Sequence, residues 1–433
     1  MYRIIPLEIF IDNKWHTLGE AHLNEDYLFQ GIRAPGFFEY DFQYLDTYGI
    51  HLFQNNIYAA SVRYPVTYER YYEDVWPAFL VDIIPSGAAR KYWLRQLQIK
   101  NGPFADFELL EKGSINPPGN IRVKSDIQLF SDHHDHNGFA YEEIIERGIH
   151  FIEYAENAGA IVSGTSGAQG ESPKFLLIED FNGKWHGDGA LPDKCIKKNW
   201  LVKYPRGKQD SDYQILKLEA AYYEVARSLG AYVHGPLKWE RNTLFIPRFD
   251  RIKQDKTIVR LGFESLISAM GVSEFGATKN IEDYIGVIRK YSSHPKKDIQ
   301  EFIFRDFLNI LMGNTDNHGR NSAFLKTNDG KIELSPLFDF APMFLDDAGI
   351  PRNSKWRNEK SHMPDFDMVF KELVDNQYLD ADELIHFLKQ TIEKLENLNS
   401  IMEKNDIDIS TILVVTDKYD IFMSGLRRFL NKK

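Results

Sequence analysis

The chain has 433 residues, of which 43% are hydrophobic and 14% aromatic, and its net charge is −11. Because single cores stop growing at roughly 250 to 300 residues, this length predicts at least two domains. The acidic balance argues against a broad nucleic-acid footprint, no stretch approaches the ~18 apolar residues of a membrane span, and the single cysteine, Cys195, fits a reducing cytoplasm.

The first part of the chain reads as a β-rich subdomain over residues 1–120. Residues 1–65 are rich in Tyr, Phe, Ile and Val and are interrupted by turn signals, which predicts strands. The start lacks the basic segment and apolar run of a signal peptide, so we expect no export. Residues 66–112 favour helix, and the proline- and glycine-rich run 114–123 predicts a domain boundary.

Residues 121–255 are expected to mix strands with one long helix. The run NWLVKYP (199–205) is apolar and ends at a proline, which predicts a strand that carries Lys203. The stretch 211–230 places apolar residues at spacings of four, three and four before a glycine, which predicts an amphipathic helix that carries Glu219.

Helical patterns prevail over residues 256–433. Residues 301–314 and 381–404 each carry an apolar stripe at helical spacing. The expected fold class is therefore α+β, with a β-rich N-terminal region and a mostly α-helical C-terminal lobe.

A loop rich in polar groups follows the apolar helix of residues 301–314. Asp316 and Asn321 lie five residues apart in it, and Asp339 follows in LSPLFDFAP. Phosphoryl transfer needs one carboxylate to accept the proton of the attacking hydroxyl and oxygen ligands for Mg²⁺. Asp316 suits the first role, Asn321 and Asp339 suit the second, and the spacing equals that of the D-x-x-x-x-N loop of kinases. The loop by itself also allows a plainer interpretation, in which these residues only cap the helix and form a turn.

Two upstream residues support a nucleotide site. A strand lysine followed by a helix glutamate, as in Lys203 and Glu219, is the arrangement by which kinases grip phosphates and orient the lysine. The connection FIPRFDR (245–251) could meet adenine with its backbone. An edge strand with solvent-facing Arg248 and Arg251 would give the same pattern.

The glycine-rich stretch SGTSGAQGESPKFLL (163–177) is interpreted as a flap over the nucleotide, with a plain flexible loop as the alternative. Glycines let backbone N–H groups approach phosphate closely. Its hydroxyl groups are candidate phosphoacceptors, and a phosphate there would add roughly −1.5 to −2 charge to a site that already holds phosphates. Autoinhibition by phosphorylation of the flap follows as a hypothesis.

Together these stretches resemble a known family. In this order, GTSGAQGESPKFLL, NWLVKYP, LEAAYYEVARSLG, IPRFDR, GNTDNHGRN and LSPLFDFAP are similar to the HipA-type serine/threonine kinases, the toxins of bacterial toxin–antitoxin modules. The segment FLVDIIPSGAARKYWL (79–94) also resembles the N-terminal segment of that family, so the likeness covers roughly residues 75–345. The resemblance implies a two-lobed kinase fold with an added N-terminal subdomain.

The resemblance also implies an activity and partners. The implied activity is ATP- and Mg²⁺-dependent phosphorylation of a translation component such as an aminoacyl-tRNA synthetase. The implied partner is a small helix-turn-helix antitoxin that binds DNA. No DNA-reading motif occurs in this chain, so we expect the antitoxin to supply the DNA contacts. Residues 1 to about 70 are the surface on which we expect partner contact.

Site residues follow from the same resemblance. Asp316 is the catalytic base, and Asn321 and Asp339 carry Mg²⁺. The backbone of Pro247 and Phe249 meets adenine. The implied nucleotide-binding residues are Gly164, Thr165, Ser166, Gly167, Ala168, Gln169, Lys203, Glu219, Pro247, Phe249, His318 and Asp339.

The chain departs from the family pattern in the flap. The usual stretch reads S-x-x-G-A-Q-x-K, with its first serine autophosphorylated. Here Gly164 takes that serine's position, and extra residues separate Gln169 from Lys174. Ser166 is therefore the first candidate for autophosphorylation, and Ser163 is the second.

Two other functions could use the same residues. Asp316, His318 and Asp339 could ligate a metal for phosphodiester hydrolysis, but a nuclease has no use for Lys203 or for the flap. A kinase fold that has lost activity would act as an interaction protein. Such a protein would normally lack an aspartate or lysine that is present here.

Overall fold

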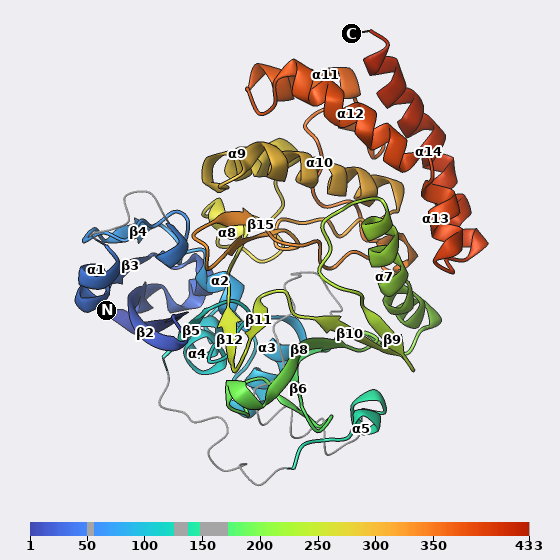
Figure 1. Cartoon of the computed structure of the whole chain (residues 1–433). Coiled ribbons are helices and arrows are strands. Elements are labelled where there is room, and N and C mark those ends of the chain that lie inside the picture. Colours follow the sequence, from blue (N-terminus) through green and yellow to red (C-terminus); the bar gives the residue numbers. More distant parts are fainter. Residues whose placement is uncertain (50–55, 125–136, 148–171, 433) are drawn as a thin grey trace.

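The computed structural model describes residues 1–49, 56–124, 137–147 and 172–432. An antiparallel sheet opens the chain, a second sheet with one long helix follows, and helices dominate the remainder. Figure 1 shows these helices above the second sheet, with the N-terminal sheet beside the junction of the two. The expected α+β class, with a β-rich N-terminal region and a mostly helical C-terminal lobe, is confirmed.

The N-terminal sheet is antiparallel, with the strand order β4-β3-β2-β1-β5. Its longest hairpin turns at Asp12 and Asn13, which have φ angles of 49° and 62°, a left-handed conformation that these residue types tolerate. The strands are β1 (Tyr2–Ile11), β2 (Lys14–Asn24), β3 (Gly36–Tyr40), β4 (Tyr71–Glu73) and β5 (Ile121–Val123). The helices are α1 (Phe42–Tyr48), α2 (Leu80–Ile83), α3 (Gly87–Gln96) and α4 (Ala105–Gly113), with 3-10 helices η1 (Glu25–Arg33) and η2 (Asn56–Tyr58).

The helical stretch expected from residue 66 begins only at Leu80, in α2. Before it, β4 pairs with β3 as an edge strand. The ring centroid of Tyr71 lies 4.8 Å from that of Tyr64, and the centroid of Tyr72 lies 4.9 Å from that of Phe37. Cross-strand aromatic packing therefore outweighs the local helical pattern here.

The second sheet has the order β7-β6-β8-β10-β9 and is also antiparallel. The predicted strand is β8 (Ile196–Lys203), and the predicted amphipathic helix is α7 (Asp210–Ser228), which ends just before Gly230 with its φ of 87°. The other strands are β6 (Lys174–Asp180), β7 (Trp185–Gly187), β9 (Lys238–Glu240) and β10 (Thr243–Pro247). Short elements beside the sheet are α5 (Tyr141–Ile145), η3 (Asp193–Cys195) and the hairpin of β11 (Arg251–Gln254) and β12 (Thr257–Arg260).

The apolar stripe of α7 faces the C-terminal lobe. Leu218, Tyr222 and Val225 are buried in the same hydrophobic core as the helices of that lobe. Because its two faces contact different parts of the protein, α7 is fixed between the second sheet and the C-terminal helices, as Figure 1 shows.

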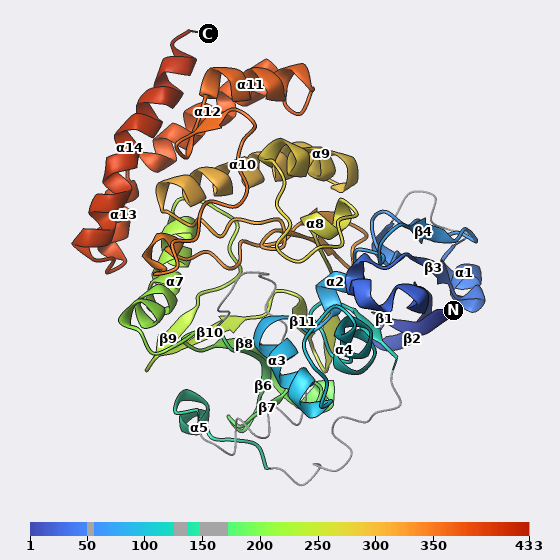
Figure 2. The same ribbon diagram turned by 180° about the vertical axis from the view of Figure 1, so that it is seen from behind.

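The C-terminal lobe combines a small sheet, β13-β14-β15, with two layers of helices. The front and back views agree that α9 and α10 lie between the strands and the outer helices (Figure 1, Figure 2). The strands are β13 (Gly262–Ser265), β14 (Ala323–Lys326), β15 (Ile332–Leu334), β16 (Glu359–Lys360) and β17 (Met363–Pro364). The helices are α8 (Leu266–Ala269), α9 (Ile281–Tyr291), α10 (Pro295–Leu311), η4 (Met343–Leu345), α11 (Phe366–Asp375), α12 (Ala381–Leu395), α13 (Leu398–Lys404) and α14 (Ile409–Leu430).

The single helix expected over residues 381–404 is two helices. α12 ends at Leu395 and α13 starts at Leu398, with Asn397 between them outside helical geometry at φ −100° and ψ 8°. The break lets Leu395 and Leu398 both reach the core. Among the described helices, none has both the length and the apolar character needed to cross a membrane.

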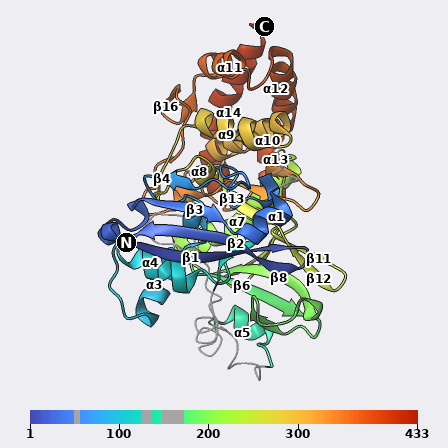
Figure 3. The same ribbon diagram turned by 90° about the vertical axis from the view of Figure 1, so that its left-hand side faces the viewer.

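The N-terminal subdomain is joined to the rest of the protein by buried polar contacts. Asp82 of α2 accepts hydrogen bonds from the backbone nitrogen of Ser265 at 2.9 Å and from its hydroxyl at 2.7 Å. The same carboxylate accepts from Nη1 of Arg320 at 2.6 Å. Figure 3 shows the N-terminal sheet in front of the junction, with the C-terminal helices above and β6 and β8 below.

Candidate active site

Lys203 ends β8 with its ammonium group in a buried ion cluster. Its Nζ donates to both carboxylate oxygens of Glu219, at 2.9 and 2.7 Å, and to Oδ1 of Asp339 at 2.6 Å. Glu219 projects from α7, and Asp339 follows β15 in the C-terminal lobe. The structure thus brings together a lysine, a glutamate and an aspartate that the sequence analysis assigned to one site.

Lys174 is a fourth member of this cluster that sequence reasoning did not place at the site. It is the first residue of β6 and lies directly opposite Lys203 in the antiparallel register. Its Nζ donates to Oδ2 of Asp339 at 3.1 Å. The signal that could have found it is the pairing of β6 with β8, since residues opposite each other on one face converge.

The charges of the cluster are mutually compensated. Burial by itself raises the pKa of Asp339, but the ammonium groups of Lys174 and Lys203 outweigh it and hold that pKa well below its usual range. Burial by itself lowers the pKa of Lys203, but the carboxylates of Asp339 and Glu219 outweigh it and hold the pKa above its usual value. Asp339 has a φ of 55°, in the left-handed region that aspartate tolerates better than most residues with a Cβ.

Asp316 lies in the loop after α10 and is fixed by two asparagines. Its Oδ1 accepts a hydrogen bond from Nδ2 of Asn353 at 2.9 Å. Its backbone oxygen accepts from Nδ2 of Asn321 at 2.8 Å. Burial, and next the negative charge of Asp339, raise the pKa of Asp316 to about 7. A carboxyl group with this pKa can take up and release a proton near neutral pH.

His318 is buried beside the carboxyl group of Asp316. Its Nε2 lies 3.6 Å from Oδ1 of Asp316 and has no hydrogen-bond partner among the described residues. Its Nδ1 accepts from the backbone nitrogen of Arg320 at 3.2 Å. Burial lowers the pKa of His318 to about 4, against the opposing effect of Asp339, so the ring is neutral at physiological pH.

Asn321 and Asp339 offer oxygen ligands for a cation. The Oδ1 of Asn321 is buried and has no hydrogen-bond partner within the described part of the chain. The nitrogen of the same amide donates to the backbone oxygen of Asp316. An unused amide oxygen together with an ionised carboxylate is a donor set that suits Mg²⁺. The residues therefore fit the metal expected from the sequence.

A cleft lies beside the ion cluster. Pro247 and Phe249, the residues expected to meet adenine, both line it. The ring of Phe249 lies 5.7 Å from that of Phe338 and 6.4 Å from that of Phe263, measured between centroids. The remaining lining residues include Lys174, Leu176, Leu201, Lys203, Glu219, Ile246 and Asp339.

The alternative interpretation of residues 245–251 as an edge strand is wrong. β10 lies between β8 and β9 in the sheet, and Arg248 and Arg251 are only 6% and 7% exposed. Nε and Nη2 of Arg248 donate to Asp250 at 2.8 and 2.6 Å, and Nη1 of Arg251 donates to Asp250 at 2.8 Å. Both arginines are buried because two carboxylates, those of Asp250 and Asp188, neutralise them.

Several residues proposed from the sequence lie outside the described part of the chain. They are the flap residues Gly164, Thr165, Ser166, Gly167, Ala168 and Gln169, and with them Ser163. The flap and its phosphorylation therefore stay predictions.

Residues 352–356 contact the loop that carries Asp316, and the sequence analysis missed them. Besides the contact of its side chain with Asp316, Asn353 donates its backbone N–H to the carbonyl oxygen of Thr315 at 3.0 Å. The surrounding stretch NSKWRNEK matches no motif, so the sequence carries no signal for this role.

Asp306 of α10 holds this segment in place. Its carboxylate accepts from Nη2 of Arg352 at 2.8 and 2.7 Å and from Nε1 of Trp356 at 2.8 Å. All three side chains are buried. The helix before the loop and the segment after Asp339 thus hold Asp316 from both sides.

Asp316, His318 and Asp339 do not converge as a three-residue metal centre. Across the described ranges, three His, Cys, Asp or Glu ligand atoms lie within 4.8 Å of one another only at Glu20, His22 and Glu39. A metallonuclease built on Asp316, His318 and Asp339 is therefore not supported.

Comparisons with known proteins agree with this geometry. Residues 165–399 match the family described as HipA-like C-terminal domain, and residues 32–124 match the HipA N-terminal domain. A Sinorhizobium fredii protein named "Putative kinase Y4mE" is 27% identical over 188 residues, an alignment that covers 40% of this chain and only 41% of that relative. HipA of Shewanella oneidensis MR-1, solved with HipB and its operator DNA, has a similar fold, with a TM-score of 0.66 at 15% identity over 98% of this chain and 97% of that one. The chain belongs to the HipA family, as its motifs predicted, and has the two-lobed fold of that family.

Proposed function

We propose that the protein is an ATP- and Mg²⁺-dependent protein kinase that phosphorylates serine or threonine. The observation that carries the proposal is the buried cluster of Lys203, Glu219 and Asp339, which lines a cleft and interacts electrostatically with Asp316. A lysine oriented by a helix glutamate, with a metal-binding aspartate next to it, is the arrangement that phosphoryl transfer from ATP requires.

In this proposal, different residues of the cleft bind different parts of the nucleotide. The apolar part of the cleft, at Pro247 and Phe249, accommodates the adenine ring, and Lys174 and Lys203 bind phosphate oxygens. Glu219 keeps the ammonium group of Lys203 directed into the cleft. Mg²⁺, when bound by Asn321 and Asp339, would neutralise the phosphate charge.

Asp316 acts as the base. Its carboxylate accepts the proton of the substrate hydroxyl while that oxygen bonds to the γ-phosphorus and the bond to the leaving ADP oxygen breaks. The pKa of about 7 makes this transfer feasible near neutral pH. Neutral His318 does not compete with Asp316 for a proton in this range because its own pKa is about 4.

The substrate and partner proposals rest on the family. We propose a translation component, such as an aminoacyl-tRNA synthetase, as the substrate, and therefore the cytoplasm as the site of action. We also propose a small helix-turn-helix antitoxin as partner, which is supported by the Shewanella HipA complex with HipB and operator DNA. Ser166, and then Ser163, are the proposed sites of autophosphorylation.

The proposed activity is tested with purified protein, radiolabelled ATP, Mg²⁺ and cell lysate. Wild type should label at least one lysate protein, and both Asp316→Ala and Asp339→Ala should abolish the label. Asp329→Ala is the matched control, since Asp329 is an exposed turn residue in the β14–β15 connection. Labelling that persists in Asp339→Ala would contradict a kinase that uses this site, whereas nucleotide binding without any turnover would favour an inactive kinase fold.

A further inference from the structure

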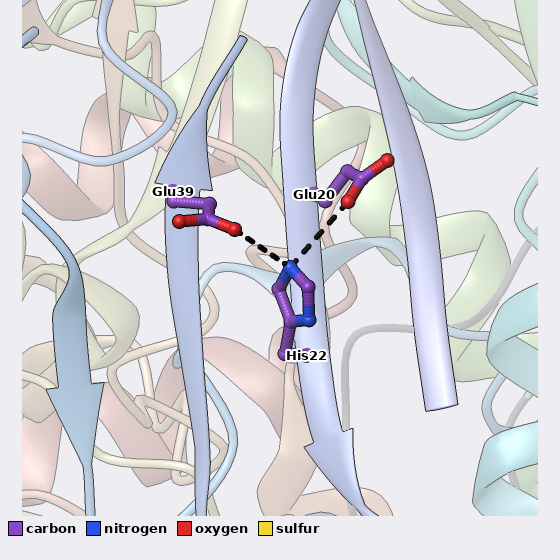
Figure 4. A group of neighbouring side chains, drawn as sticks. All are labelled: Glu20, His22 and Glu39. Atoms are coloured by element: carbon purple, nitrogen blue, oxygen red, sulfur yellow. Dashed lines mark ion pairs between the residues drawn. The ribbon is translucent and has the colours of Figure 1, made fainter. Parts of the chain in front are cut away.

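We propose that Glu20, His22 and Glu39 form a zinc site on the N-terminal sheet. Glu20 and His22 lie two residues apart on β2, so their side chains share one face of the sheet. Glu39 lies directly opposite Glu20 on the neighbouring strand β3. Figure 4 shows the imidazole of His22 pointing between the two carboxylates. None of the three residues lines the nucleotide cleft, so this site is separate from the kinase site.

The spacing of the imidazole nitrogen from each carboxylate suits a metal ion. Nε2 of His22 lies 3.1 Å from Oε1 of Glu39 and 3.5 Å from Oε2 of Glu20. Tetrahedral zinc with bonds of about 2.0 to 2.1 Å places neighbouring ligand atoms roughly 3.3 to 3.4 Å apart. The two measured distances bracket that value.

The Nε2 nitrogen of His22 faces the two carboxylates. Its Nε2 is buried, and among the described residues it has no hydrogen-bond partner, although two carboxylates lie near it. The nitrogen faces the gap between the carboxylates rather than either oxygen, as a ligand to a shared ion does. A buried polar atom left without a partner costs free energy, which a bound cation would remove.

Neighbouring side chains hold the imidazole in this orientation. The ring of His22 stacks on Phe37, with centroids 4.3 Å apart and an angle of 6° between the planes. Tyr2 contacts the same ring edge-on at 6.5 Å. Only 12% of the His22 side chain is exposed, so the ligand is held in place before any ion arrives.

The carboxylates are arranged to accept a cation. Glu20 and Glu39 place like charges directly opposite each other, which by itself destabilises a strand pair. Nε of Arg70 donates to Oε2 of Glu39 at 2.6 Å and leaves Oε1 facing His22. Such an outer contact orients a ligating carboxylate. The side chain of Glu20 is 48% exposed, which leaves room for water as the fourth ligand.

The choice of zinc follows from the donor atoms. One imidazole nitrogen with two carboxylate oxygens is a set that zinc accepts, whereas Mg²⁺ prefers oxygen ligands alone. A bound ion would cross-link β2 and β3 in the sheet and so stabilise the N-terminal subdomain.

The test uses the full chain, freed of metal with a chelator and titrated with Zn²⁺ by calorimetry. Wild type should bind one equivalent that His22→Gln and Glu39→Gln each weaken at least tenfold. His16→Gln is the matched control, since His16 lies on the same strand and contacts Tyr48 instead. Asp339→Asn should still bind one equivalent of Zn²⁺. This result would show that the ion does not bind at the carboxylates of the cleft.

A second readout covers variants that fold poorly. Zn²⁺ should raise the Tm of wild type and of His16→Gln by several degrees but leave that of His22→Gln unchanged. The proposal is overturned if wild type takes up no Zn²⁺, or if His22→Gln and Glu39→Gln bind it as tightly as wild type does.

Discussion

The carboxyl group of Asp316 combines burial with a negative neighbour, and this combination gives it a pKa of about 7. The hydrogen bond from Asn353 opposes the shift, because an N–H donor stabilises the ionised form. Asn353 therefore both orients the proposed base and keeps it ionised over part of the physiological range. Together with the charges of Lys174 and Lys203, this amide therefore lowers the pH at which the base is lost.

The first prediction concerns Asn353→Ala. Removing the donor should raise the pKa of Asp316 further, and because only the carboxylate accepts a proton, the acid limb of kcat/KM should move to higher pH. A shift of about one pH unit would lower kcat/KM about fivefold at pH 7 and leave it near the wild-type value at pH 9. The measurement is the pH profile of phosphorylation.

The control for this prediction is Asn328→Ala, which removes an exposed asparagine from the turn between β14 and β15. Its profile should coincide with that of wild type. If Asn353→Ala lowers activity by the same factor at every pH, the amide positions the loop but does not tune the base.

At the scale of elements, the pairing of β6 with β8 brings together the two lysines that we propose to bind phosphate. The register places Lys174 opposite Lys203, and the two ammonium groups hold the two oxygens of Asp339. Lys203 also donates to Glu219, whereas among the described residues the ammonium group of Lys174 donates only to Asp339. The ammonium group of Lys174 can therefore exchange its carboxylate partner for a phosphate oxygen more readily than that of Lys203 can.

The second prediction follows for Lys174→Met. Loss of one charge-assisted hydrogen bond to phosphate, worth about 1.5 to 3 kcal/mol, should raise the KM for ATP about 10- to 100-fold, with a smaller effect on kcat. Steady-state kinetics with varied ATP measures this. Lys197→Met on β8 is the control, since Lys197 is 52% exposed and pairs with Glu179 at the surface. An unchanged KM in Lys174→Met would exclude this lysine from phosphate binding.

At the scale of the whole molecule, the N-terminal subdomain contacts the loop of residues 315–322, which carries Asp316. Arg320, two residues after His318, forms a buried ion pair with Asp82 of α2. Arg320 also donates to the backbone oxygen of Glu274 at 3.2 Å. The position of the loop therefore depends on the docking of a subdomain that lies far from it in the sequence.

The third prediction tests this dependence with Asp82→Asn. Without the carboxylate, the buried guanidinium of Arg320 has no counter-charge, which should lower the free energy of unfolding by about 3 kcal/mol. Hydrogen exchange should speed up both in α2 and in residues 315–322. Chemical denaturation and hydrogen-exchange mass spectrometry measure the two effects.

The exposed Asp74 of the same subdomain provides the control, and Asp74→Asn should leave both readings unchanged. Faster exchange confined to α2 in Asp82→Asn would show that the loop keeps its position without the subdomain.

The sequence by itself determined the family, the α+β class and the main polar residues of the site. Asp316, Asn321, Asp339, Lys203 and Glu219 were recognisable because their spacing and the patterns around them are local, and local periodicity reports helices and strands directly. The flap was predicted from its glycines in the same way and stays a prediction, since its residues lie outside the described ranges.

Only the tertiary structure decided which distant residues complete the site. Lys174 depends on a strand register, Asn353 on a segment held by Asp306, and the burial of Arg248 on a carboxylate that neutralises it. The zinc site likewise depends on the register of β2 with β3. These features arise from contacts between residues that are separated along the chain or paired across strands, and no local pattern in a single sequence records such a contact.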